Sequence, residues 1–184
     1  MENVKSEIKA IVPRDALQEV LRSISDSVEE IEVLITDSQI RFRLGEIEIT
    51  SKLIDASFPD YRQLIPKDIN LNIELDKAEL IRMTKVASLF ARESGGSINC
   101  EAKKDDGLFS ISAVASELGE NTASMEADIK EDGKVALNSR YLLDALNATV
   151  EGKITFGMSG KLAPVVIRNV KNQDYTHIIM PLKS

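Results

Sequence analysis

The segment LNIELDKAELIRMTKVASLF, residues 71–90, decides the fold of this chain. Its first six residues alternate between apolar and polar side chains, which predicts a strand with one buried face. Asp76 then stands where a helix N-cap is expected, and apolar side chains recur at helical spacing after it. The segment therefore predicts a strand that leads directly into an amphipathic helix, with Leu80 four residues after the cap.

Two other segments of the chain repeat this pattern. They are IKAIVPRDALQEVLRSIS at residues 8–25 and KVALNSRYLLDALNAT at residues 134–149. The three helix starts are Pro13, Asp76 and Asn138, at intervals of 63 and 62 residues. Proline suits a helix start because the N–H that it lacks has no partner there. The near-constant interval indicates an internal duplication.

Three further strands are expected after each of these helices. The predicted strands are 31–35, 39–44 and 47–54 in the first repeat, 97–102, 108–115 and 124–129 in the second, and 153–158, 164–169 and 175–180 in the third. Turn-forming residues, such as those at 36–38, 105–107 and 119–121, separate them. The unit is strand, helix and three strands, which predicts an α+β fold with helices layered on antiparallel sheets. The alternative is a single α+β domain whose internal similarity is accidental.

The composition indicates a soluble protein of the cytoplasm. The 184 residues carry a net charge of −7 and include one cysteine, so no internal disulfide framework exists. The N-terminus MENVKSEIKA has no apolar core of a signal peptide, and the apolar runs are too short to span a membrane. The negative charge argues against nucleic-acid binding over the whole surface, but it allows a local basic patch.

The sequence contains no recognisable catalytic or metal-binding pattern. His177 is the only histidine, and no cysteine or carboxylate cluster stands at metal-ligand spacing from it. Neither a P-loop nor a G-x-G-x-x-G fingerprint is present. Cys100 falls in a predicted strand, where a cysteine is usually a small buried hydrophobe. We therefore expect neither an enzyme nor a bound metal or cofactor.

The words SFPDYRQLIP at residues 57–66 resemble the linker between the second and third domains of the bacterial sliding clamp, the beta subunit of DNA polymerase III. SLFARE at 88–93, LNSRYLLDALNA at 137–148 and MPL at 180–182 follow in the order typical of that family. The resemblance implies the sliding-clamp fold, with helices on the inner face of a ring and antiparallel sheets outside.

The resemblance also implies a domain organisation. A full clamp subunit has three domains of two repeats each, whereas this chain has three repeats. It therefore resembles the second half of the middle domain plus linker over residues 1–65, followed by the C-terminal (third) domain over residues 66–184. A full-length clamp would form a head-to-tail ring dimer. This shorter chain is expected as a monomer, or as a non-native dimer in which two half-domains pair across a two-fold axis.

The function implied by the resemblance is that of a non-catalytic processivity factor on duplex DNA. Its expected partners are the polymerase subunit of DNA polymerase III, the clamp loader and repair polymerases, each binding through a short linear motif. Its expected location is the bacterial cytoplasm, at the nucleoid. The alternative is a stand-alone interaction module that binds such motifs without encircling DNA.

A basic helix face is the candidate DNA-facing surface. A helical wheel of residues 77–90 places basic side chains on one arc, near Thr84 and Ser88, and places Val86 on the opposite, apolar arc. The candidate DNA-facing residues are Arg14, Arg22, Lys77, Arg82, Lys85 and Arg140. No base-reading set is evident, so we expect contacts to the DNA backbone without sequence preference. The alternative is an ordinary solvated face.

The apolar C-terminal tail, HIIMPLKS, is the candidate receiving surface for partner peptides. By position in the resembled family, the pocket comprises Pro59, Gln63, Leu64, Asn138, Tyr141, Pro164, Val165, Ile178, Ile179, Met180, Pro181 and Leu182. Methionine suits a site that accepts many ligands. The alternative is a last core strand, and partial burial of Ile178 and Met180 is expected in both cases. Family members often carry arginine where Gln63 stands.

The resemblance further implies a subunit contact at Leu89 and Phe90, at the end of the second helix. Leu89 lies off the apolar arc of that helix, which favours an exposed position. Phe90 fits a core position equally well.

Overall fold

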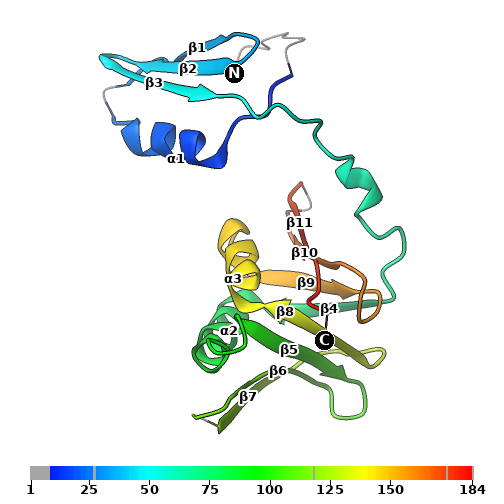
Figure 1. The fold of residues 1–184 in the computed structure, drawn as a ribbon. Helices are drawn as coiled ribbons and strands as arrows, with labels where there is room; N and C mark the ends of the chain where they lie inside the picture. Colours follow the sequence, from blue (N-terminus) through cyan, green and yellow to red (C-terminus); the bar gives the residue numbers. More distant parts are fainter. Residues whose placement is uncertain (1–8, 27, 118, 173, 184) are drawn as a thin grey trace. The chain divides into compact units, whose positions relative to one another are not determined.

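The computed structural model (Figure 1) describes residues 9–26, 28–117, 119–172 and 174–183. The chain divides into two compact units, Met1–Pro59 and Asp60–Ser184. We call them unit 1 and unit 2. The division falls after Pro59, whereas the domain boundary expected from the resemblance followed residue 65.

Unit 1 contains one helix packed on a three-stranded antiparallel sheet of order β1-β2-β3. Its elements are α1 (Arg14–Ser23), β1 (Glu32–Ile35), β2 (Gln39–Leu44) and β3 (Ile47–Lys52). Strand β2 buries Ile40, Phe42 and Leu44 in strict alternation, and Val20 of α1 packs on them. This small cluster is the core of unit 1.

The predicted opening strand of unit 1 is wrong for the residues that the structure describes. Residues 9–12 adopt no strand, and residue 8 lies outside the described residues. One backbone hydrogen bond, from the Ile54 N–H to the Ile11 carbonyl oxygen at 2.9 Å, ties this segment to the chain just after β3. A strand needs a ladder of such hydrogen bonds, and a single one leaves residues 9–12 outside the sheet.

Unit 2 contains two sheets and two helices. Its elements are the 3-10 turn η1 (Tyr61–Gln63), β4 (Leu71–Asp76), α2 (Lys77–Phe90), β5 (Ser97–Lys103), β6 (Leu108–Ala115), β7 (Gly119–Glu126), β8 (Gly133–Asn138), α3 (Ser139–Ala148), β9 (Lys153–Met158), β10 (Val165–Asn169) and β11 (Thr176–Ile179). The predicted repeat of strand, helix and three strands is confirmed here. The α+β fold with antiparallel sheets is confirmed as well.

The two repeats of unit 2 exchange their opening strands. The sheet orders are β11-β10-β9-β4 and β7-β6-β5-β8. Strand β4 opens the second repeat but pairs with β9 of the third, and β8 opens the third repeat but pairs with β5 of the second. Each sheet thus has three strands from one repeat and a fourth from the other, which locks the repeats into one domain.

The core of unit 2 lies between the sheets and the helices. Helices α2 and α3 pack side by side (Figure 1). The rings of Phe109 on β6 and Phe156 on β9 meet edge to face, with centroids 5.2 Å apart, and both are fully buried. Since β6 and β9 belong to different sheets, this pair joins the two sheets through the core.

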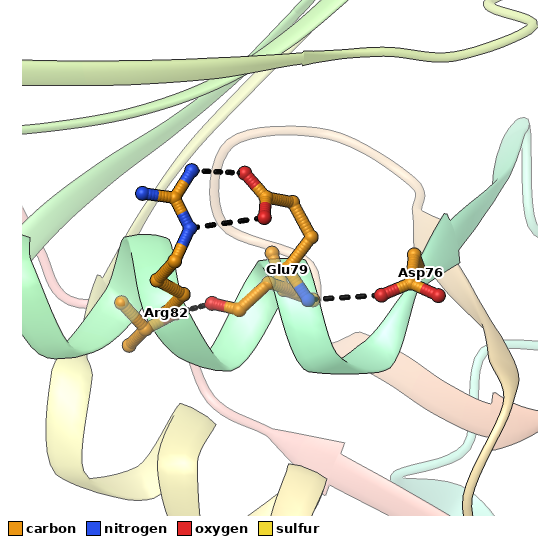
Figure 2. Close-up of polar contacts among 5 residues, drawn as sticks. Asp76, Glu79 and Arg82 are labelled. Atoms are coloured by element: carbon orange, nitrogen blue, oxygen red, sulfur yellow. Dashed lines mark hydrogen bonds and ion pairs between the residues drawn. The ribbon is translucent and has the colours of Figure 1, made fainter.

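The predicted caps start both helices of unit 2. The Asp76 carboxylate accepts a hydrogen bond from the Glu79 N–H at 2.9 Å (Figure 2), and the Asn138 side chain accepts one from the Arg140 N–H at 2.9 Å. Each cap satisfies an N–H that the first helical turn leaves unpaired.

Some predicted details are wrong. Strand β7 is Gly119–Glu126 rather than 124–129, because it pairs with β6 along its whole length and so takes in the residues expected as a turn. Thr84 is fully buried, with its hydroxyl donating to the Leu80 carbonyl oxygen at 2.7 Å, whereas Val86 is exposed. Helix α2 packs against α3, β6 and β7, and its buried arc of Leu80, Met83, Thr84 and Ala87 differs from the one that the wheel predicted.

Candidate functional site

The C-terminal tail leaves the core directly after β11. Ile179 is 2% exposed and belongs to the core, whereas Met180 is 57% exposed. The Leu182 N–H donates to the Ala136 carbonyl oxygen of β8 at 2.8 Å, which fixes the tail beside that strand. Figure 1 shows the chain end next to β8. The tail is thus a pinned, partly exposed apolar segment rather than a continuation of the last strand.

The start of α3 is held rigidly near this tail, two residues beyond Ala136. The Asn138 side chain caps the helix and also donates to the Gly95 carbonyl oxygen at 3.1 Å. Gly96 takes a φ of +86°, and a side chain there would press on Asn138, so only glycine fits well. Tyr141, in the first turn of α3, is 56% exposed. The amphipathic ring of Tyr141 is therefore exposed on the capped first turn of α3, near the tail.

A polar pair that the sequence did not predict lies at the start of β11, with Tyr175 directly before the strand and His177 in it. The Tyr175 hydroxyl is 2.8 Å from Nδ1 of His177. Burial lowers the pKa of His177, and the carboxylate of Asp144 on α3 opposes this shift. Burial also raises the pKa of Tyr175. Helix α3 contacts β11, which brings the Asp144 carboxylate within electrostatic reach of His177. The only signal in the sequence was the position of His177 just before the tail.

The predicted pocket residues differ in their exposure. Val165 and Ile179 are buried in the core, so their side chains support the surface from below. Met180, Tyr141 and Leu64 are exposed. Ile178, Pro164, Pro181 and Leu182 are half-buried, and Pro59 and Gln63 are exposed. The expected partial burial is confirmed for Ile178 and is wrong for Met180, because β11 ends before Met180.

The linker residues of the predicted pocket fall in different units. Pro59 is the last residue of unit 1, whereas Gln63 and Leu64 begin unit 2. The Gln63 side chain donates to the Asp60 carboxylate at 3.2 Å. Two hollows of unit 2, one beside Glu126 and one beside Asp132, contain none of the predicted pocket residues. The candidate surface is therefore formed by side chains around the tail and not by these hollows.

The candidate DNA-facing cations are not equally available. The Lys77 ammonium donates to the Thr149 carbonyl oxygen at 2.7 Å, at the C-terminal end of α3. The Arg82 guanidinium donates two parallel hydrogen bonds to the Glu79 carboxylate (Figure 2). These hydrogen bonds raise the pKa of Arg82 and lower that of Glu79. Arg22 pairs with Glu19 at 3.3 Å.

The remaining three candidate cations differ from these. Within the described ranges of the chain, Lys85, Arg140 and Arg14 are exposed and have side chains without an ion pair. Of these, Lys85 and Arg140 belong to unit 2, on the neighbouring helices α2 and α3.

The predicted contact residues at the end of α2 take different positions. Leu89 is half-exposed, and Phe90 is partly buried against the core of unit 2. The exposed part of the Leu89 side chain can therefore contact another molecule, whereas Phe90 packs partly on the core of unit 2.

In the part of the chain that the structure describes, no group of three histidine, cysteine or carboxylate residues gathers as metal ligands. No described helix is long and apolar enough to cross a membrane. Cys100 is fully buried, as its strand position predicted, and burial raises the pKa of its thiol to about 12. A thiol so protonated is a poor nucleophile.

Interlocked repeats with capped helices layered on antiparallel sheets define a protein of the DNA-clamp class. The pattern described as "DNA polymerase III beta subunit, C-terminal domain" matches residues 62–183, and that described as "DNA polymerase III beta subunit, central domain" matches residues 1–60. The chain belongs to the family of DNA polymerase III beta subunits, the bacterial sliding clamps.

Individual relatives agree with this assignment. The chain is 27% identical to the beta sliding clamp of Staphylococcus aureus, over 100% of this chain and 49% of that protein. A solved clamp of Bartonella birtlesii superposes with a TM-score of 0.84 at 25% identity, over 95% of this chain and 47% of that one. A clamp structure from Pseudomonas aeruginosa gives a TM-score of 0.83 at 24% identity, over 95% and 48%. The chain thus spans about half the length of these relatives.

Proposed function

We propose that this chain acts as part of a non-catalytic DNA sliding clamp. In this role it tethers the polymerase subunit of DNA polymerase III, the clamp loader and repair polymerases to duplex DNA, at the nucleoid in the bacterial cytoplasm. The observation that carries the proposal is the exposed apolar tail pinned to β8 by the Leu182 N–H. In the full-length form, two subunits would close head to tail into a ring, with Leu89 and Phe90 at the contact.

Ligands found on relatives support a receiving surface of this kind. One Bartonella birtlesii clamp was solved bound to griselimycin. A Caulobacter crescentus clamp carries polyethylene glycol at a "putative beta-motif tethering region". We assign the equivalent role here to the surface around Met180, Leu182, Tyr141 and Asn138 of unit 2, with the buried side chains of Val165 and Ile179 in the core beneath it. Burying one leucine and one phenylalanine of a peptide contributes about 1.5–3 kcal/mol each before ordering costs.

The first test is a titration of the 184-residue chain with a fluorescent peptide of the Gln-x-x-Leu-Phe type. We expect saturable binding with a dissociation constant in the micromolar range, on the order of 8 kcal/mol of binding free energy. The matched control is the same peptide with alanine in place of its Leu-Phe pair, which should bind at least about tenfold more weakly because it loses the apolar contact. Equal binding of the two peptides would contradict the proposal.

DNA contact by this chain should be weak and purely electrostatic. Lys85 and Arg140 are exposed and have no ion pair with any residue that the structure describes, so we expect binding in the range of non-specific complexes, about 10⁻⁴–10⁻⁶ M, that falls steeply with salt. In filter binding at several salt concentrations, two duplexes of unrelated sequence should give the same curve. Lys85→Ala should reduce the salt slope by about 1. Sequence-selective binding that persists at high salt would contradict a sliding role.

A specific observation favours a second candidate function, a peptide-binding module that does not encircle DNA. Lys77 and Arg82, two of the six candidate DNA-facing cations, are already engaged within unit 2. This module would be favoured if the chain binds the peptide but shows no DNA binding at any salt concentration.

A further inference from the structure

His177 occupies an inward-facing position at the edge of its sheet. It lies opposite Ile167 on β10, and two residues further on Ile179 lies opposite Val165. Ile167, Val165 and Ile179 are buried in the core of unit 2, and side chains two residues apart on a strand share one face. A titratable ring thus lies on the core side of a four-residue edge strand, three residues before the exposed Met180.

The imidazole of His177 contacts the phenol of Tyr175, the residue directly before the strand. The Tyr175 hydroxyl lies 2.8 Å from Nδ1 of His177, and the centroids of the two rings are 6.1 Å apart. A hydroxyl can donate to Nδ1 of a neutral imidazole, whereas Nδ1 of an imidazolium carries its own proton and accepts no hydrogen bond. A hydrogen bond donated by the phenol therefore exists only while His177 is neutral.

Strand β10 and helix α3 pack against β11, and their charged groups act differently on His177. The titratable side chains of these two elements and of the turn before β11 are Arg140, Tyr141, Asp144, Arg168, Lys171, Asp174 and Tyr175. Arg168 points to the opposite face of the sheet, where its Nε donates to the Thr176 hydroxyl at 3.2 Å. Burial favours the neutral imidazole and lowers the pKa of His177 below its usual 6.5, while the weaker effect of the Asp144 carboxylate favours the protonated form.

The position of the tail depends on β11. Ile179 is anchored in the core, and the chain leaves the sheet at the next residue, Met180. Beyond it, the Leu182 N–H donates to the Ala136 carbonyl oxygen of β8 at 2.8 Å, which is a hydrogen bond to the other sheet. Met180 therefore lies between two anchors, and a shift of β11 would move the first of them.

We propose that His177 is a positioning residue for the tail, and that its protonation weakens peptide binding. The neutral ring accepts the Tyr175 hydroxyl and keeps the inward face of β11 packed beside α3. The protonated ring loses this acceptor and is attracted to the Asp144 carboxylate and to water, because a charge beside the core is costly. Strand β11 and the tail after it then loosen. The effect on peptide binding rests on the proposed function, whereas the effect on β11 does not.

Acid should therefore weaken both the packing of β11 and the binding of the peptide. Because burial lowers the pKa of His177, the unfolded chain binds more protons than the folded chain as the pH falls below about 6.5. The contribution of this group to the stability of unit 2 is complete above that pH and is lost as the pH drops through the lowered pKa of the folded state. The dissociation constant of the peptide should rise by up to about tenfold per pH unit below that pKa, because only the neutral fraction is competent to bind.

The first test follows the free 184-residue chain by nuclear magnetic resonance between about pH 8 and pH 5, where histidine is the side chain that ordinarily titrates. The chain contains one histidine, so its ring protons report the protonation of His177 directly. We expect the amide resonance of Leu182 to shift with the same midpoint as the ring. In His177→Gln, which has no titrating ring, the Leu182 resonance should stay constant over this range.

Two variants should move the midpoint of the ring in opposite directions. Tyr175→Phe removes the hydroxyl that favours the neutral ring, so the midpoint should rise. Asp144→Asn removes the charge that favours the protonated ring, so the midpoint should fall. The matched control is Asp174→Asn, an exposed carboxylate of the turn, which should leave the midpoint unchanged. A Leu182 resonance that does not follow the ring, or a midpoint that neither Tyr175→Phe nor Asp144→Asn moves, overturns the proposal.

The second test titrates the chain with an acetylated Gln-x-x-Leu-Phe peptide over the same pH range, because acetylation removes the titrating amino group of the peptide. The dissociation constant should rise as the pH falls, with the midpoint of the ring, and the ratio of its values at the two ends of the range should be about 1 in His177→Gln. A constant affinity of the unmodified chain, or an unchanged pH profile in His177→Gln, overturns the effect on binding.

The two tests separate this proposal from the proposed function. Absence of peptide binding at every pH overturns the proposed function and the effect on binding together. A common midpoint of the His177 ring and the Leu182 amide would still support His177 as the positioning residue of the tail, because the first test uses no peptide.

Discussion

Phe156→Ala should destabilise unit 2 by about 3–5 kcal/mol, the largest stability change expected for a single substitution here. Phe156 is fully buried on β9, and its ring meets that of Phe109 edge to face at 5.2 Å. Alanine would remove the apolar surface of the ring and the aromatic contact, and it would leave a cavity between two sheets that cannot both move inward. The Phe109–Phe156 contact also joins the two sheets, so its loss should destabilise both repeats of unit 2.

The measurement is urea unfolding followed by far-ultraviolet circular dichroism, because the chain contains no tryptophan. The two units have separate cores, so the transition to compare is that of unit 2. The matched control is Val114→Ala, an exposed apolar side chain on β6, which should change the free energy of unfolding by no more than about 0.5 kcal/mol. A loss below about 1.5 kcal/mol for Phe156→Ala would show that the sheets can close the cavity.

Local patterns predicted much of this fold. Strands β2, β6 and β9 have the predicted bounds, because alternation of side chains along one strand is a property of that strand alone. Asp76 and Asn138 cap the helices as predicted, since a cap depends on residues two or three positions away. The repeat followed from the same local signals at a regular interval.

The features that the sequence did not predict depend on distant partners. The exchange of β4 and β8 joins segments on either side of a whole repeat, and no local pattern encodes which edge a strand will choose. The Lys77 ammonium donates a hydrogen bond to the carbonyl oxygen of Thr149, 72 residues away, and no local pattern encodes that contact. Thr84 was placed on the polar side of its helix but is fully buried, and the elements that α2 packs against (α3, β6 and β7) lie outside the local pattern that the helical wheel uses.

The tail variant Met180→Ala, Leu182→Ala should weaken binding of the Gln-x-x-Leu-Phe peptide by about ten- to hundredfold. Two side chains that would cover the peptide are truncated, and a buried apolar side chain contributes about 1.5–3 kcal/mol at most. Peptide anisotropy and calorimetric titration at one temperature measure this loss directly. The prediction rests on the proposed receiving surface, and it is the largest effect expected on binding.

The tail variant should keep its fold, so the loss would report on binding alone. Met180 is 57% exposed, and the hydrogen bond that pins the tail uses the Leu182 backbone N–H, which alanine retains. The matched control is Leu89→Ala, a half-exposed leucine at the end of α2, which should bind the peptide with unchanged affinity. If the tail variant binds as tightly as the unmodified chain, the peptide does not contact the tail. The pinned segment would then serve only to close the edge beside β8.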